Sequence, residues 1–142
     1  MQFEASTQIN APSATVFSLY ANVPGWPTWD PDVKAASLAG DFVSGAKGVI
    51  VPHGGPKSEI IFTEVVTNKK FAAQCKLPLC TMRFEHELDG TQGSGTQATH
   101  RVIFRGFLAP LFGRLIGSGM RKTLPNALAG LKQAAEAKAA AV

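Results

Sequence analysis

Near Phe107 the spacing of the apolar residues changes, and this change sets the fold class. Upstream, short segments alternate apolar and polar residues, as half-buried β-strands do. Downstream, apolar residues recur at three- and four-residue steps, as they do along one side of an amphipathic helix. A sheet with one apolar face and a helix with one apolar side bury these surfaces against each other. The sequence therefore predicts an α+β domain in which a long C-terminal helix covers a sheet.

Seven segments upstream of this change have the alternation, or the β-branched and aromatic content, of strands. Residues rich in glycine, proline and asparagine separate most of them, which predicts an antiparallel meander. Two short helical segments are expected between the first and second strands, one opening at Pro12 and one at the tryptophan-bearing turn that follows Pro24. The predicted strands are Gln2–Ile9, Val33–Ala39, Gly48–Pro52, Ser58–Val66, Lys70–Leu77, Leu79–Leu88 and Thr96–Gly106.

The C-terminal segment is expected to form one helix from Phe107, kinked at Pro125 because proline lacks the N–H that an interior helical position needs. Its alanine-rich tail from Gln133 is expected to fray. A seven-stranded sheet curls through its twist, and one helix does not fill the concave side. The sequence therefore predicts a cavity between the sheet and this helix, and function is expected there.

Composition narrows the classes of partner. With 142 residues, of which 45% are apolar and 17% charged, the chain suits a single domain over residues 1–142. The net charge of +4 comes from basic residues spread along the chain, which argues against nucleic acid. No apolar run approaches the roughly 18 residues of a membrane span, and the N-terminus alternates like a strand, so the cytoplasm is the expected location. Cys75 and Cys80 are expected to be free, buried thiols, although a bridge is sterically possible if they face each other across a hairpin.

Several short motifs together resemble the START-like superfamily, also called SRPBCC. More narrowly, they resemble the polyketide cyclase/dehydrase and lipid-transport group of bacterial proteins. The resemblance implies a helix-grip fold, with a curved sheet wrapped around the C-terminal helix and a hydrophobic pocket enclosed between them. It implies no particular catalytic residue. The segments that carry it are Ile9–Phe17, Trp26–Pro31, Gly95–Thr96 with Thr99–Val102, Phe107–Phe112, and Leu124–Leu128 with Leu131–Lys132.

Two histidines are the candidates for chemistry. His86 and His100 fall on the apolar faces of adjacent strands, directly opposite each other or one diagonal step apart. Imidazoles facing an apolar cavity could orient a ligand carbonyl or phenol, or act as general acid and base near neutral pH. Either histidine could equally be a core residue satisfied by a neighbour.

The expected cavity wall combines the two histidines with apolar residues. Plain core packing accounts for these residues nearly as well, although Gly113, Gly117 and Gly119 favour a cavity because they leave volume unfilled. In the tryptophan turn, Trp29 is expected to plug the end of the core and Asp30 to cap a turn, while Trp26 is a candidate for the pocket. The remaining candidates for the wall are Met82, Phe84, Val102, Phe104, Phe112, Leu115, Ile116 and Met120.

Motifs for cofactors and metals fail on inspection. The segment Gly117–Thr123 ends in Lys-Thr but lacks the glycine and the spacing of a phosphate-binding loop. His86-Glu87 has no second histidine four residues on, as a zinc protease needs. No cofactor and no metal site is therefore expected. The basic residues Arg114, Arg121, Lys122 and Lys132 could touch an anionic membrane or an anionic ligand, but charges on a helix are more typical of its solvated side.

The leading functional hypothesis is the binding or transport of a small hydrophobic molecule, either a lipid or an aromatic, polyketide-like compound. One alternative is a polyketide cyclase, aromatase or dehydratase that uses His86 and His100 as acid and base. Another is a protein-interaction module that works through a sheet edge or the basic helix. The partner expected is the small molecule alone, with no integral membrane association, and the chain is expected to be a monomer or weak homodimer.

Overall fold

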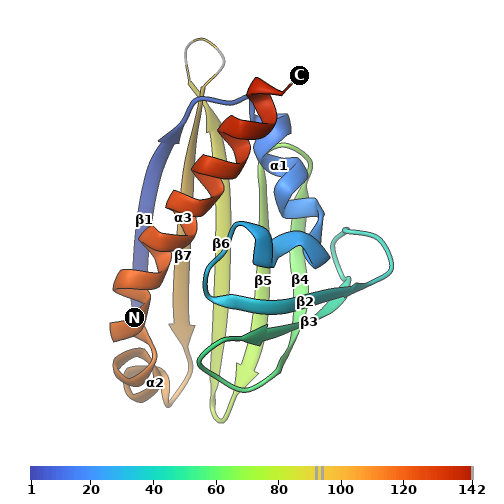
Figure 1. The fold of residues 1–142 in the computed structure, drawn as a ribbon. Helices are drawn as coiled ribbons and strands as arrows, with labels where there is room; N and C mark the ends of the chain where they lie inside the picture. The colour runs from blue at the N-terminus through green and yellow to red at the C-terminus, as the bar shows by residue number, and fades with distance from the viewer. Residues whose placement is uncertain (92, 94, 142) are drawn as a thin grey trace.

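The computed structural model describes residues 1–91, 93 and 95–141, and in these residues seven strands form one sheet (Figure 1). Two short helices lie between the first two strands, as predicted. The elements in chain order are β1 (Gln2–Ile9), α1 (Ser13–Ala21), the 3-10 helix η1 (Val23–Thr28), β2 (Val33–Ala39), β3 (Lys47–Pro52), β4 (Ser58–Val66), β5 (Lys70–Leu77), β6 (Cys80–Gly90), β7 (Thr96–Arg105), α2 (Ala109–Leu115) and α3 (Gly117–Ala140).

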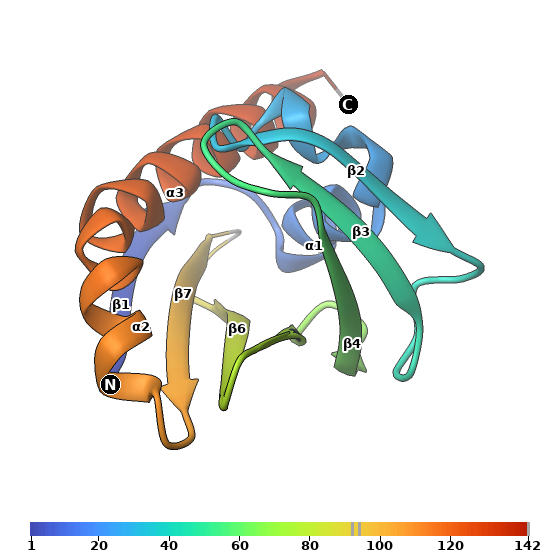
Figure 2. The ribbon, with the colours of Figure 1, turned by 90° about the horizontal axis from the view of Figure 1, so that it is seen from below.

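The sheet is antiparallel throughout and has the order β1-β7-β6-β5-β4-β3-β2. Consecutive strands are therefore neighbours except at β1, which pairs with the last strand from Gln2↔Ile103 to Ile9↔Thr96. Figure 2 shows the sheet strongly curved, with α3 along one side of it and α1 at the far end. This arrangement confirms the predicted curved sheet wrapped around a C-terminal helix.

The C-terminal helix differs from its prediction as a single rod. Two helices are present, α2 and α3, and they meet at Ile116. The backbone at Gly117 lies so close to the ring of Phe3 that a Cβ at this position would overlap the aromatic carbons. This close approach to β1 fixes the bend at the glycine. Pro125, where the kink was expected, lies inside α3, and the helix continues past it to Ala140.

The alanine-rich tail was expected to fray and does not. It is helical to Ala140, and Ala135 is fully buried. Lys132 Nζ donates to the carbonyl of Gln8, and Glu136 accepts a hydrogen bond from the backbone N–H of Asn10. These contacts attach the last turns of α3 to the end of β1. Val142 lies outside the described residues.

The three glycines expected to leave empty volume do so at one position only. A Cβ on Gly113 would collide with the side chain of Met1, and one on Gly117 with Phe3, so neighbouring side chains occupy that space. Only Gly119 faces open space. The cavity of this protein therefore does not arise from missing side chains in α2 and α3.

Charged side chains cover the convex face of the sheet, as the alternation predicted. Arg101 on β7 donates to Glu4 on β1 at 2.6 Å and to Glu85 and Glu87 on β6 at 2.8 and 2.9 Å. These ion pairs join three neighbouring strands from the solvent side. On the other face, Cys75 and Cys80 are buried free thiols, as expected. No helix in the described part of the chain is long and apolar enough to cross a membrane.

Candidate functional site

The two candidate histidines face each other on the concave side of the sheet. His86 and His100 are direct cross-strand partners on β6 and β7, and their ring centroids lie 4.5 Å apart. The register therefore selects the directly opposite arrangement of the two that the sequence allowed. His100 is almost completely buried. His86 lies flat against the ring of Phe71 on β5, at 4.0 Å between centroids.

A tyrosine from the first helix completes this cluster. Tyr20, the only tyrosine in the chain, is fully buried and shares a hydrogen bond of 2.8 Å with Nε2 of His100. Its ring also lies edge-on to Phe71, at 4.9 Å between centroids. The hydrogen bond ties α1 to the centre of the sheet and fixes the orientation of the His100 ring.

The three polar side chains of the cluster are uncharged at neutral pH. Burial lowers the pKa of His100 to about 3, because apolar surroundings disfavour the imidazolium ion. Burial, together with the neighbouring His100, holds the pKa of His86 well below its usual range. Burial also raises the pKa of the Tyr20 hydroxyl far above its ordinary value. The cluster therefore presents hydrogen-bonding groups without a charge.

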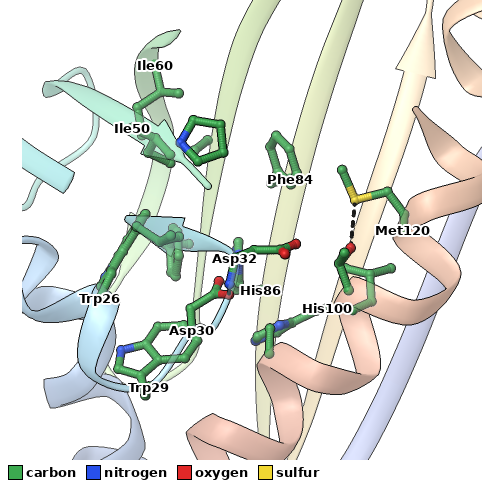
Figure 3. Close-up of a pocket in the computed structure, with 17 residues that line it drawn as sticks. Trp26, Trp29, Asp30, Asp32, Ile50, Ile60, Phe84, His86, His100 and Met120 are labelled. Atoms are coloured by element: carbon green, nitrogen blue, oxygen red, sulfur yellow. Dashed lines mark hydrogen bonds between the residues drawn. The ribbon is translucent and has the colours of Figure 1, made fainter. Parts of the chain in front are cut away.

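A cavity of about 180 Å³ lies in front of this cluster (Figure 3). Its wall combines the inner face of the sheet with the η1–β2 segment on one side and α3 on the other. Most of the lining is apolar. The lining residues are Trp26, Trp29, Asp30, Asp32, Val33, Ile50, Pro52, Ile60, Phe71, Ala73, Phe84, His86, His100, Met120, Thr123, Leu124 and Ala127.

Two aspartates form the acidic part of the wall. Asp32 is exposed and Asp30 half-buried, so the cavity reaches the surface here. Oδ1 of Asp30 accepts a hydrogen bond of 3.0 Å from the backbone N–H of Asp32, which confirms that Asp30 caps a turn. Burial raises the pKa of the Asp30 carboxyl to about 6, an effect that this hydrogen bond opposes in part. Such a pKa suits proton exchange near neutral pH.

Two buried polar atoms on lining residues have no partner. Nε1 of Trp29 and Nδ1 of His86 make no hydrogen bond to any described residue. The indole of Trp26, by contrast, donates to the backbone carbonyl of Tyr20 at 3.0 Å. A buried polar group without a partner costs about 1–3 kcal/mol. Both atoms are inaccessible to water, so they lie just behind the surface of the cavity wall.

The structure brings five of the predicted wall residues together and places six elsewhere. Trp26, Phe84, His86, His100 and Met120 line the cavity. Leu115 is largely exposed on α2, because the bend at Gly117 turns this helix away from the concave face. The other five pack in or beside the apolar cluster between the sheet and α2, outside the cavity lining: Met82, Val102, Phe104, Phe112 and Ile116.

Three central residues escaped the sequence-based interpretation. Phe71 alternates inward along its strand and could have been found from that pattern. Tyr20 lies on the apolar side of the first helix, but no local signal shows that its hydroxyl meets a histidine 80 residues away. Asp30 was expected only to cap a turn. Trp29, expected to be a plug, lines the cavity, and its backbone carbonyl abuts Gly130 of α3.

The described residues contain no group of three or more histidine, cysteine, aspartate or glutamate side chains placed to hold a metal ion. The site contains a half-buried carboxyl, two neutral imidazoles and a buried tyrosine hydroxyl around one small cavity.

A family model described as polyketide cyclase/dehydrase and lipid transport matches residues 1–136. The chain belongs to this family. No curated protein sequence matches the chain. The family description covers both enzymes and lipid carriers, so membership supports a hydrophobic ligand or a cyclase reaction only in general terms.

Solved structures similar to this family member include aromatase/cyclases. The di-domain aromatase/cyclase BexL of the BE-7585A biosynthetic pathway aligns with a TM-score of 0.77 and 16% sequence identity. The alignment covers 96% of this chain but only 46% of BexL, so this chain spans about half the length of that protein. The Zhui aromatase/cyclase from Streptomyces sp. R1128 aligns with a TM-score of 0.75 and 15% sequence identity, and the alignment covers 96% of this chain and 93% of Zhui. Truncated norcoclaurine synthase from Thalictrum flavum aligns with a TM-score of 0.72 and 11% sequence identity, and the alignment covers 94% of this chain and 91% of that protein. At these identities the similarity shows a shared fold.

Proposed function

We propose that residues 1–142 form one ligand-binding domain that holds a small, mostly apolar molecule in the cavity between the sheet and α3. The cavity volume of about 180 Å³ carries this proposal. An apolar protein cavity of about 150 Å³ accepts benzene, so this one suits a ligand of about one ring. A lipid chain or a multi-ring polyketide would place only part of its length inside.

The two unpartnered polar atoms favour a ligand that carries an oxygen. When the side chains that cover these atoms move aside, a ligand hydroxyl can donate to or accept from Nδ1 of His86, depending on the imidazole tautomer, and it can accept from the indole N–H of Trp29. A ligand hydroxyl or carbonyl would satisfy a group that is otherwise buried at a cost of about 1–3 kcal/mol. The preferred ligand is therefore a phenol or an aromatic carbonyl compound rather than a hydrocarbon.

Calorimetric titration with p-cresol and toluene tests this preference. The two molecules share the ring and the methyl group and differ in one hydroxyl. We expect p-cresol to bind at least about tenfold more tightly, since one satisfied polar group is worth that much. His86→Phe should remove most of the difference and leave toluene binding in place.

Filling the cavity separates binding inside it from binding elsewhere. Ala127 is buried on α3 and lines the cavity, while Ala137 on the same helix is exposed. Ala127→Phe should abolish binding of both ligands, and Ala137→Phe should leave it unchanged. If Ala127→Phe folds and still binds p-cresol with unchanged affinity, the ligand does not occupy this cavity and the proposal is wrong.

A second candidate function is the cyclisation of a small poly-β-ketone. In such an aldol reaction a base removes a proton from the carbon between two carbonyl groups, a carbon–carbon bond forms, and the new alkoxide takes up a proton. The pKa of about 6 makes Asp30 a better-matched base than either histidine, whose depressed pKa makes it a weak one. The histidines would then orient the carbonyl groups.

Turnover of a linear poly-β-ketone surrogate, followed by absorbance, tests this candidate. Asp30→Asn should lower the rate by about 100-fold or more while ligand affinity is kept. The pH–rate profile of the parent protein should inflect near pH 6 and that of the variant should not. Replacing both His86 and His100 with phenylalanine should also abolish turnover. Equal rates in all these variants would exclude cyclase chemistry in this cavity and leave the binding proposal untouched.

A further inference from the structure

One end of the molecule exposes four bulky apolar side chains. Phe107 is 84% exposed, Leu111 49% and Leu115 67%. Leu79, in the turn between β5 and β6, is 69% exposed. Apolar residues of this size are common singly on a protein surface, but a contiguous group marks an interaction site. These four residues form the apolar tip of the molecule.

The apolar tip is contiguous because of how α2 is built. Phe107, Leu111 and Leu115 are four residues apart, so they lie along one side of α2 and the turn before it. The opposite side carries residues that pack against the sheet, including Phe112. Leu79 adjoins the start of the helix, since its carbonyl accepts a hydrogen bond of 3.0 Å from the backbone N–H of Leu108. Figures 1 and 2 show α2 at the end of the fold opposite the C-terminus.

Basic residues flank the apolar tip along the chain, and the same stretches of sequence contain no acidic residue. No aspartate or glutamate occurs between Asp89 and Glu136, or between Glu64 and Glu85. These two stretches contain the whole of α2 and the β5–β6 turn. The exposed cations nearest the tip along the chain are Lys76, Arg105, Arg114, Arg121 and Lys122, and none of them forms an ion pair within the described residues.

We propose that the apolar tip docks this protein on an anionic lipid bilayer. Exposed aromatic and leucine side chains bury themselves in the headgroup–acyl boundary, while nearby lysine and arginine side chains meet anionic headgroups. A second copy of this chain fits the tip less well, because a symmetric contact would bring the same unpaired cations together. The seven-residue helix is too short to span a bilayer, so the contact is peripheral.

Vesicle co-sedimentation tests the proposal on the intact chain. The probes are vesicles of phosphatidylcholine alone and vesicles with about 30% phosphatidylglycerol. The protein should bind the anionic vesicles at least about tenfold more tightly than the neutral ones, and about 0.5 M salt should weaken that binding. The triple variant Phe107→Ser, Leu111→Ser, Leu115→Ser should lose about tenfold or more of the affinity for anionic vesicles.

Two matched controls keep the test specific. Val43→Ser removes an apolar side chain that is 53% exposed between β2 and β3, and it should leave vesicle binding unchanged. Arg105→Gln with Arg114→Gln should reduce binding to anionic vesicles more than Lys34→Gln with Lys69→Gln, two exposed lysines away from the tip. Unfolding curves of all variants should match that of the parent protein, because the replaced side chains are exposed.

Tryptophan fluorescence tests whether the apolar tip inserts into the bilayer. Leu111→Trp adds an exposed indole to two buried ones, and its fluorescence should shift to shorter wavelength when anionic vesicles are added. Failure of the parent protein to bind anionic vesicles, or equal binding by the triple variant, would overturn the proposal. If sedimentation analysis instead shows a dimer that the triple variant converts to a monomer, and vesicles do not bind, the tip is a self-association surface.

Discussion

Single side chains at the centre of the fold decide its response to acid. His86 and His100 are neutral in the folded protein because burial depresses both pKa values. In the unfolded chain an imidazole has its ordinary pKa of about 6.5 and takes up a proton below that pH. Between pH 6.5 and about 3, the unfolded state therefore binds protons that the folded state does not. The stability contributed by these residues is present above pH 6.5 and is lost as the pH falls.

His100→Gln tests this linkage. Glutamine does not titrate and can still accept a hydrogen bond from Tyr20. Lowering the pH from about 7.5 to about 5 should cost the parent protein roughly 2 kcal/mol more of its free energy of unfolding than it costs the variant. Urea unfolding at the two pH values measures the difference. His53→Gln, at an exposed histidine outside the cavity, should keep the full loss, and an identical loss in His100→Gln would contradict the argument.

At the scale of whole elements, the position of α3 depends on its contact with the tryptophan turn. At Gly130 the helix meets the backbone carbonyl of Trp29 so closely that a Cβ would overlap the oxygen. The same contact holds one wall of the cavity against another, because Trp29 and α3 both contribute to the lining. Glycine is therefore needed at this position for packing, despite its low helix propensity.

Gly130→Ala and Gly119→Ala form a matched pair within this helix. Overpacking at Gly130 should lower the free energy of unfolding by about 1–3 kcal/mol. Gly119 faces open space, so alanine there should raise it by up to about 1 kcal/mol through helix propensity. Urea unfolding at neutral pH gives both values. Equal effects of the two substitutions would show that backbone propensity, and not the contact with Trp29, controls this helix.

The elements also show why local pattern predicts some features and not others. The predicted limits of β1, β2, β4 and β5 agree with the observed ones. Neighbouring residues of a strand point to opposite faces, so the sequence itself shows the alternation of buried and exposed positions. The helical period runs unbroken through Ile116, so it does not reveal the end of α2. What separates the helices is the approach of Gly117 to Phe3, a residue more than one hundred positions earlier.

At the scale of the whole molecule, the same distinction applies to the candidate site. The two histidines were found because their strands are adjacent and alternate. The hydroxyl of Tyr20, the carboxyl of Asp30 and the contact of Trp29 with α3 come from separate elements, and only the assembled fold unites them. Likewise, the helical period did not distinguish buried from exposed apolar residues, so Leu115 was placed in the cavity although it belongs to the apolar tip.

The pairing of β1 with β7 sets an order for events during synthesis. Gln2–Ile9 is synthesised before the other six strands, yet its partner strand among the described residues, Thr96–Arg105, is made some ninety residues later. Until then β1 has no neighbour on the sheet, and the strands β2 to β6 can pair only among themselves. Contacts so distant along the chain slow the rate-limiting step of folding. β1 therefore stays without its native partner until Thr96–Arg105 has been synthesised.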